Sequence, residues 1–230
     1  MAHREYHATL GVYIKDFIYG ANDGIITTFA IVTGASGAGF SPLVVIVLGF
    51  ANLFADGFSM AASNYLGSSS EAALFREEEK REIREVEEKP DVEREEVREI
   101  LTRQGFDPAT ATKMTETIAS NKNFWVDFMM RYEVEMLPGE SSIKSAVITF
   151  CAFVVIGSLP LLPFIILSAN GITIFYSVIS TGVALFVTGA LRSIFTKKHW
   201  FISGLEMFFI GGVAAAVSYF VGYGLKLLVG

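Results

Sequence analysis

Histidine and cysteine are scarce in this 230-residue chain, which has three histidines and one cysteine. A single cysteine cannot form a disulfide framework, and Cys151 lies in an apolar run, where we expect a packed core thiol. No histidine lies in an E-x-x-H or H-E-x-x-H pattern, so a histidine-bearing di-iron oxidase and a zinc protease are unsupported. The sequence also lacks a Walker A motif, which argues against an ATP-driven pump.

Charged residues are few as well, at 18% of the chain, against roughly 25% in soluble domains. They are concentrated in one stretch, Arg76–Glu99. There, eleven Glu and one Asp against seven Lys or Arg account for −5 of the formal net charge of −6. The mean hydropathy of the whole chain is nevertheless +0.47. This composition indicates a membrane protein with one soluble insert, for which nucleic acid is not an expected partner.

Five apolar stretches are long enough to cross a bilayer, which takes about 20 residues for each helix. They are too continuously apolar for amphipathic surface helices. Their approximate bounds are Val12–Gly34, Leu43–Gly67, Ile143–Ser168, Ile172–Leu191 and Phe201–Leu225. The expected fold is all-α, with five transmembrane helices and a helical cytosolic insert between the second and the third. The expected regions are 1–67 (membrane helices 1 and 2), 68–140 (the insert) and 141–230 (membrane helices 3 to 5).

Basic residues are unevenly distributed among the connections. They flank the N-terminus and the link between the fourth and fifth spans: Arg4, Lys15, Arg192, Lys197 and Lys198. The loops 34–42 and 168–171 carry no charge. Because short basic loops stay in the cytosol, we expect the N-terminus and the insert inside and the C-terminus outside. The short termini without targeting extensions favour a prokaryotic cell membrane over a vacuolar one.

Turn signals divide the insert into four expected helices, over 71–89, 92–103, 108–120 and 123–136. Asp91 and Asp107 are plausible N-caps of the second and third helices. Gly105 suits the end of the second helix, and Pro138 is expected to end the fourth.

Acidic residues inside membrane helices are energetically costly, and by default they are functional hypotheses. Asp23, Asp56 and Glu206 qualify. For Asp23, the structural alternative is a local hydrogen bond that stabilises a helix contact. Glu206 lies near the cytosolic end of the last span, so we expect it to pair with Lys198 or Arg192.

The second span carries a stripe of residues at four-residue intervals: Asn52, Asp56, Met60 and Asn64. This spacing places them on one helix face. Carboxylates suit hard cations, while a thioether shifts the preference toward softer transition metals. Packing is the alternative role for Met60. Together with Asp23, this stripe is the predicted transport pathway.

Glutamates recur on helix faces of the insert. Glu78, Glu82 and Glu85 follow one another on the first helix, and Glu93, Glu96 and Glu99 on the second. From the spacing alone, solvated faces with i,i+4 ion pairs are the simpler interpretation. Further along lie Met129, Met130 and Glu133, among aromatic residues, where core packing is the default.

Three segments together resemble the vacuolar iron transporter family, in a bacterial-type form. They are Asp16–Gly24 (DFIYGANDG), Asp56–Leu66 (DGFSMAASNYL) and Asp127–Glu133 (DFMMRYE). The resemblance covers nearly the whole chain. It implies a dimer with five membrane helices in each subunit, which moves iron from the cytosol in exchange for protons. The pathway it implies lies at the dimer interface, lined by the first two helices.

The resemblance also implies roles for individual residues. Asp23 and Met60 match pathway positions, and the cytosolic metal-binding residues match Glu82, Glu85, Glu93, Glu96, Met129, Met130 and Glu133. With Glu78, these form the predicted metal-binding set. One departure is Asn52, where plant-type members carry a glutamate. Since Asn cannot titrate, Asp56 on the same stripe is the candidate to replace that carboxylate.

The predicted function is therefore a membrane transporter of Fe²⁺, with Mn²⁺ or another divalent transition metal as a possible substrate, and not an enzyme. No organic cofactor is expected. The expected partners are the lipid bilayer, a second copy of the chain, metal ions and protons. One alternative is a membrane-anchored metal-binding or sensing protein without transport. Another is a membrane ferroxidase, against which the missing histidine motifs argue.

Overall fold

The computed structural model describes residues 2–138, 141–167 and 173–229, and all regular elements in these ranges are helices. The expectation of an all-α chain is thus confirmed for the described residues. The chain divides into two compact units. We call Met1–Leu66 with Ser141–Gly230 the membrane unit, and Gly67–Glu140 the insert unit.

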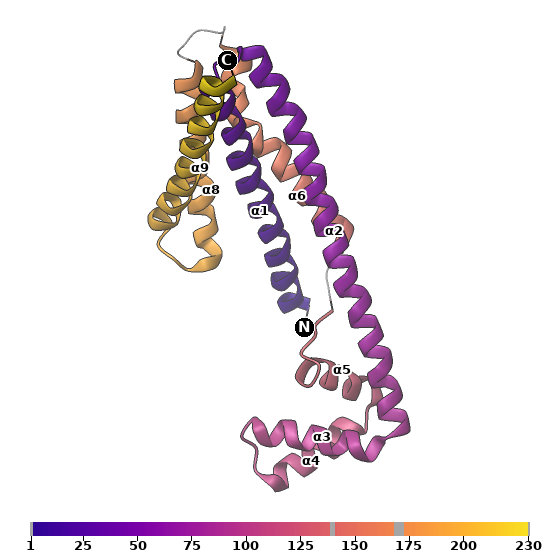
Figure 1. Cartoon of the computed structure of the whole chain (residues 1–230). Coiled ribbons are helices and arrows are strands. Elements are labelled where there is room, and N and C mark those ends of the chain that lie inside the picture. Colours follow the sequence, from indigo (N-terminus) through magenta and orange to yellow (C-terminus); the bar gives the residue numbers. More distant parts are fainter. Residues whose placement is uncertain (1, 139–140, 168–172, 230) are drawn as a thin grey trace. The chain divides into compact units, whose positions relative to one another are not determined.

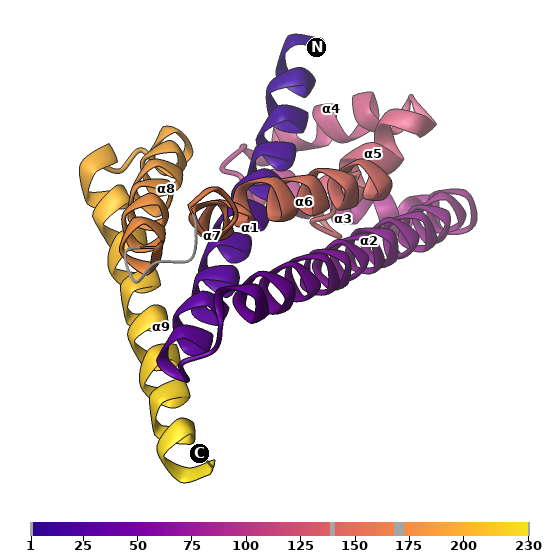
Figure 2. The same ribbon diagram turned by 90° about the horizontal axis from the view of Figure 1, so that it is seen from above.

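Helix α1 lies at the centre of the membrane unit. It packs against α6, α8 and α9, and α8 and α9 also pack side by side (Figures 1 and 2). The bounds of the helices in this unit are α1 Ala2–Gly37, α2 Pro42–Glu88 (which continues into the insert unit), α6 Ser142–Gly157, α7 Leu162–Ile166, α8 Thr173–Thr196 and α9 Trp200–Val229. A short 3₁₀ helix, η1 (Leu159–Leu161), joins α6 to α7.

Glycine allows α1 to approach its neighbours closely. A Cβ at Gly24 would lie 2.5 Å from the carbonyl oxygen of Phe153 on α6. On the other side, a Cβ at Gly222 of α9 would overlap the carbonyl oxygen of Gly34. Small residues at such contacts are typical of helices that pack inside a bilayer. Alanine at either position would push α1 away from its neighbour.

Four helices in the described part of the chain are long and apolar enough to cross a membrane. Their bounds are Pro42–Glu88, Ser142–Ile166, Thr173–Ile194 and Trp200–Val229. Helix α1 is not among them, although Ala21 and Ile25 on its inner face are fully buried. It carries the charged residues Lys15, Asp16 and Asp23. Four spans therefore agree with the sequence analysis, and passage of α1 through the membrane stays a prediction.

The third predicted span is not one continuous helix. Helix α6 ends at Gly157, and the chain continues through η1 into α7. Pro160 and Pro163 explain the interruption, because proline lacks the N–H that a helix interior needs. The predicted end at Ser168 and the predicted start of the next span at Ile172 lie outside the described residues.

The outward face of α6 is apolar and exposed. It is formed by Ile143, Val147, Cys151 and Val155, at four-residue intervals. The prediction of a packed core thiol at Cys151 is therefore wrong. Helical spacing, and not the apolar composition of the run, decides which side chains face the protein.

The insert unit has its own hydrophobic core. The end of α2 packs with α3 (Pro90–Arg103), α4 (Pro108–Ala119) and α5 (Lys122–Tyr132). Trp125, Val97 and Met129 are buried at the centre of this core. Arg94 lies over the Trp125 ring, with 5.6 Å between its guanidinium carbon and the ring centroid.

The ends of these helices test the predicted caps. Asp107 is the N-cap of α4, as predicted, and its carboxylate accepts from the backbone N–H groups of Ala109 and Thr110 at 3.1 Å. Gly105 follows the end of α3 with a φ of +97°, a left-handed conformation that glycine adopts without strain.

Two predicted boundaries are wrong. The N-cap of α3 is Lys89, and Asp91 lies inside the first turn, paired with Arg94 at 3.2 Å. Pro90 accounts for this shift, because proline is favoured as the first residue of a helix. Helix α5 ends at Tyr132, before 136, and Glu135 has a φ of +57°.

Candidate metal-binding sites

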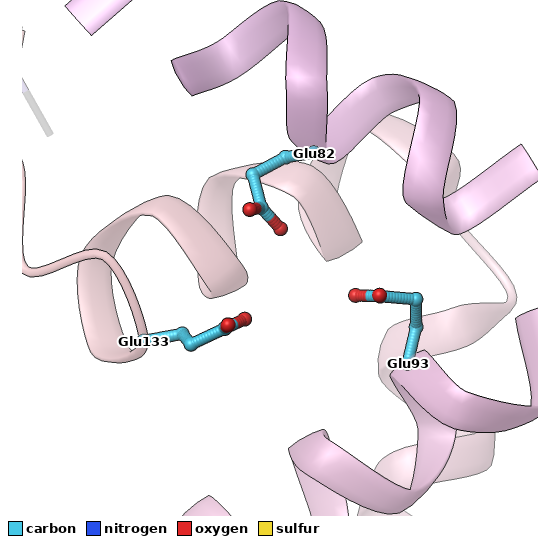
Figure 3. Close-up of side chains that lie close together, drawn as sticks. All are labelled: Glu82, Glu93 and Glu133. Carbon is cyan, nitrogen blue, oxygen red and sulfur yellow. The ribbon is translucent and has the colours of Figure 1, made fainter. Parts of the chain in front are cut away.

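Three glutamates from three different helices converge in the insert unit. Glu82 comes from α2, Glu93 from α3, and Glu133 caps the C-terminus of α5. Each offers one carboxylate oxygen, and these oxygens lie within 4.8 Å of one another. Figure 3 shows the three carboxyl groups pointing toward a shared centre. We call Glu82, Glu93 and Glu133 the glutamate cluster.

Helical spacing explains why the first two of these side chains point inward. Glu82 lies one turn before Val86, and Glu93 one turn before Val97, and both valines belong to the buried core. Residues four apart share a helix face, so each glutamate lies on the same buried face as the valine one turn after it. Glu82 is 0% exposed and Glu93 is 3% exposed, which is rare for carboxylates.

The buried oxygens of the cluster lack hydrogen-bond partners among the described residues. This holds for both carboxylate oxygens of Glu82 and for Oε2 of Glu93. The nearest cation to Glu82 is Arg81, whose guanidinium nitrogen lies 3.7 Å from Oε1. An unsatisfied buried carboxylate is costly, so the site is suited to a proton or to a cation.

Burial is the main cause of raised pKa values in the cluster, with repulsion between carboxylates second. The pKa of Glu82 rises to about 7 through burial and the charges of Glu133 and Glu85. The pKa of Glu93 also rises to about 7, through burial and the charges of Glu96 and Glu82. Glu133 is solvent-exposed as a residue, but partial burial of its carboxyl group and the charge of Glu96 raise its pKa too. Near neutral pH the empty cluster therefore retains protons that a divalent cation would displace.

The remaining predicted ligands of the insert lie around the cluster or in the core. Glu85 and Glu96 are half-buried, and their charges act on the cluster. Glu78 forms an ion pair with Arg81 at 2.8 Å. Met129 and Met130 are buried in the hydrophobic core, and a ligand role for them stays a prediction.

The membrane unit contains a cavity of about 840 Å³ that holds two of the predicted pathway residues. Asp23 of α1 and Met60 of α2 both line it. The other lining residues are Lys15, Ile18, Tyr19, Asn22, Ile26, Arg192, Thr196 and Met207. One carboxylate, two thioethers and one amide are therefore available in this cavity from a single chain.

The four-residue stripe on α2 meets different surroundings along its length. Asn52 donates a hydrogen bond to Asp56, with 2.6 Å between Nδ2 and Oδ2. Asn64 does not line the cavity of Met60. Its amide donates to Asp16 at 3.2 Å and to Thr149 at 2.8 Å, which links α2 to α1 and α6.

Sequence reasoning did not predict two hydrogen-bond partners of Asn64, namely Asp16 and Thr149. Asp16 is buried at 8% exposure and accepts a hydrogen bond from Asn64. Thr149, in an apolar run, gave no signal at all. The predicted pairing of Glu206 is confirmed: its Oε2 lies 3.5 Å from Arg192 and 3.6 Å from Lys198.

Known proteins are similar to this chain along almost all of its length. The VIT family profile matches residues 14–223. The chain is 34% identical over 219 residues to vacuolar iron transporter 1 of Eucalyptus grandis and to that of Arabidopsis thaliana, covering 94% of this chain and 88% of each relative. It is also 34% identical over 235 residues to a vacuolar iron transporter of Plasmodium falciparum (isolate 3D7), covering 97% of this chain and 86% of the relative.

Proposed function

Since this chain belongs to the VIT family, we propose that it carries Fe²⁺ across a membrane, out of the cytosol and in exchange for protons. The resemblance noted in the three sequence motifs is confirmed by the family match. Membership supports a metal transporter, not an enzyme. Fe²⁺ as the substrate, proton exchange and a pathway at a dimer interface are parts of the proposal.

The glutamate cluster is the observation that carries the proposal. We propose that Fe²⁺ is first captured by Glu82, Glu93 and Glu133, whose oxygens lie within 4.8 Å of one another. Unsatisfied buried carboxylates and repulsion between neighbouring charges both favour a divalent cation there. Carboxylate oxygens are also suitable ligands for Mn²⁺, so Mn²⁺ is a second candidate substrate.

In the next step the ion passes to Asp23 and Met60, which share one cavity. One chain offers too few ligands there for a complete coordination shell. A second copy related by a two-fold axis would double each ligand and cover Asp23, whose side chain is exposed in the single chain. A charged group facing lipid is costly, which supports the dimer in this proposal.

Proton coupling in the proposal uses Asp23 and Asp56, which alternate between a proton and the metal ion. Asp56 takes the place of the glutamate that plant-type members carry at the position of Asn52. The hydrogen bond that Asn52 donates to Asp56 supports this exchange of roles, because it holds the Asp56 carboxyl group beside the side chain of residue 52.

The proposed orientation has the N-terminus and the insert in the cytosol and the C-terminus outside. It rests on the basic residues near the N-terminus and between α8 and α9. The relatives named above are called vacuolar iron transporters, and location of this chain in a prokaryotic cell membrane stays a prediction.

The test is Fe²⁺ uptake by proteoliposomes containing the full-length protein, with and without an imposed pH gradient. Uptake that follows the gradient supports exchange of metal for protons. Metal binding without uptake would instead identify a membrane-anchored metal-binding protein. Oxidation of Fe²⁺ by the detergent-solubilised protein would favour a ferroxidase.

A further inference from the structure

The cavity that contains Asp23 and Met60 also contains two cationic side chains. Lys15 of α1 and Arg192 of α8 both line it. Asp23 is the only acidic residue among the described lining residues. A guanidinium in the same cavity competes with a divalent cation for that carboxylate, because arginine binds carboxylates through two parallel hydrogen bonds.

Both cations are engaged by other groups. Nη1 of Arg192 lies 3.5 Å from Oε2 of Glu206 on α9. Nζ of Lys15 lies 5.8 Å from the centroid of the Tyr19 ring, within the range of a cation–π contact. In the described part of the chain, no ion pair within 4.0 Å joins either cation to Asp23.

Glu206 is placed to hold Arg192 without entering the cavity itself. Its neighbour Met207 lines the cavity, whereas Glu206 does not. Glu206 also forms an ion pair with Lys198 at 3.6 Å, and Lys198 does not line the cavity. One carboxylate therefore binds one cation from inside the cavity and one from outside it.

We propose that Glu206 is a positioning residue, which holds the guanidinium of Arg192 away from Asp23 and so keeps that carboxylate available to the transported cation. This inference rests on the proposed function of the cavity as a metal pathway. Without Glu206, the carboxylate open to Arg192 is that of Asp23, the only acidic residue among the described lining residues of the cavity, and Arg192 pairs with it. An ion pair that only stabilises the link between α8 and α9 would have no such effect on metal binding.

The test compares four variants in proteoliposomes: Glu206→Gln, Arg192→Gln, the double variant, and Lys198→Gln as the matched control. Glu206→Gln is expected to raise the KM for Fe²⁺ about tenfold or more with little change in maximal rate. A cation beside a carboxylate typically stabilises its charged form by about tenfold or more, and Fe²⁺ must displace that cation. The double variant restores the KM, because the competing guanidinium is gone. Lys198→Gln leaves the KM unchanged, because it removes only the cation outside the cavity.

Two results would overturn the inference. One is a wild-type KM in Glu206→Gln, and the other is a raised KM that Arg192→Gln does not restore, which would show a structural role. If Glu206→Gln does not give folded protein, Glu206→Asp replaces it, with the same expected rescue by Arg192→Gln.

A second measurement separates this inference from the proposed function. Co²⁺ binding is measured in full-length protein whose glutamate cluster carries Glu82→Gln, Glu93→Gln and Glu133→Gln, so that the membrane cavity is the site observed. Weaker binding in Glu206→Gln, restored in the double variant, supports the inference even if the wild type shows no uptake. Equal Co²⁺ binding in all variants overturns it, whatever the uptake results.

Discussion

The insert unit and the membrane unit both collect carboxylates, but they do so to different degrees. In the insert, three glutamates from three helices bring their oxygens within 4.8 Å of one another. In the membrane unit, Asp23 lines a cavity with Met60. Asp56 accepts a hydrogen bond from Asn52, and Asp16 accepts one from Asn64. The insert thus brings three carboxylates together within one chain, whereas the described lining of the membrane cavity contains one.

The difference reflects what each environment allows when no metal is present. Water reaches the rim of the glutamate cluster at Glu133, so protons can neutralise its crowded charges. Inside a bilayer the same crowding would cost much more. A capture site can therefore be dense in carboxylates, while a pathway is better served by few ligands in each chain, supplemented by a second copy.

Replacing Asp23 should distinguish most clearly between the function of the membrane unit and that of the insert unit. We expect Asp23→Ala to abolish Fe²⁺ uptake, since it removes the only carboxylate among the described lining residues of the cavity. Metal binding by the glutamate cluster should be unchanged. Proteoliposome uptake, metal titration and size-exclusion chromatography of the same preparation check this. Full uptake by the variant would remove Asp23 from the proposed pathway.

The converse change is Glu82→Gln, which leaves the membrane cavity intact. We expect the insert to bind Co²⁺ at least about tenfold more weakly, because even second-shell changes at metal sites cost about 10- to 100-fold. The matched control is Glu99→Gln, on an exposed part of α3. Titration of the full-length protein measures both affinities, and an equal loss in the two variants would contradict a localised cluster.

Metal affinity of the cluster should depend on pH. Burial raises the pKa values of Glu82 and Glu93 to about 7, so metal binding near neutral pH displaces protons. We expect Co²⁺ affinity to rise with pH between about 5.5 and 8, by up to about tenfold per pH unit for each proton released. The cluster variant with three glutamines should lose this dependence. A flat profile in the wild type would show that the glutamates are already ionised.

The free energy of unfolding of the metal-free insert should fall as the pH rises, whereas its metal affinity rises. The folded pKa values of Glu82 and Glu93 are above their ordinary value of 4.5. Their protonation thus contributes stability below pH 4.5, and this is lost as the pH rises through about 7. A shift of this size corresponds to roughly 3 kcal/mol for one group, and the two contributions are not additive, because the charge of Glu82 contributes to the raised pKa of Glu93.

Trp125 in the insert core can report this unfolding. In a Trp200→Phe background it is the only remaining tryptophan, so its fluorescence follows the insert within the full-length protein. Thermal unfolding with a chelator should occur at lower temperature at pH 8 than at pH 5. Glu82→Gln should reduce the difference. An unfolding temperature that rises with pH would contradict raised pKa values at Glu82 and Glu93.

The smallest expected effect concerns metal preference in the cavity. Met60→Leu nearly preserves volume, so packing should change little, while the soft sulfur ligand is lost. We expect the ratio of Fe²⁺ to Mn²⁺ uptake to fall a few-fold. Met207→Leu is the control, because Met207 lines the same cavity from α9. The same change in both variants would indicate packing, not ligation by Met60.

Local signals in the sequence predicted local structure well. Asp107-Pro108 predicted a helix start, and Gly105 a helix end, because the backbone geometry of caps depends on a few adjacent residues. The same approach misplaced the start of α3, where Pro90 and Asp91 compete for neighbouring positions. It also missed the break of the third span at Pro160.

The sequence by itself determined the helical class, four of the membrane spans, the presence of a charged insert and, through three short motifs, the family. Only the tertiary structure decided which side chains meet. Glu78, Glu82 and Glu93 are alike in sequence, yet Glu82 and Glu93 converge with Glu133 while Glu78 pairs with Arg81. Helical periodicity assigns residues to faces, but the packing of helices distant in the sequence determines which faces come together. The same reason separates Asn64 from Met60 on one stripe, and brings Arg192 and Asp23 into the lining of one cavity.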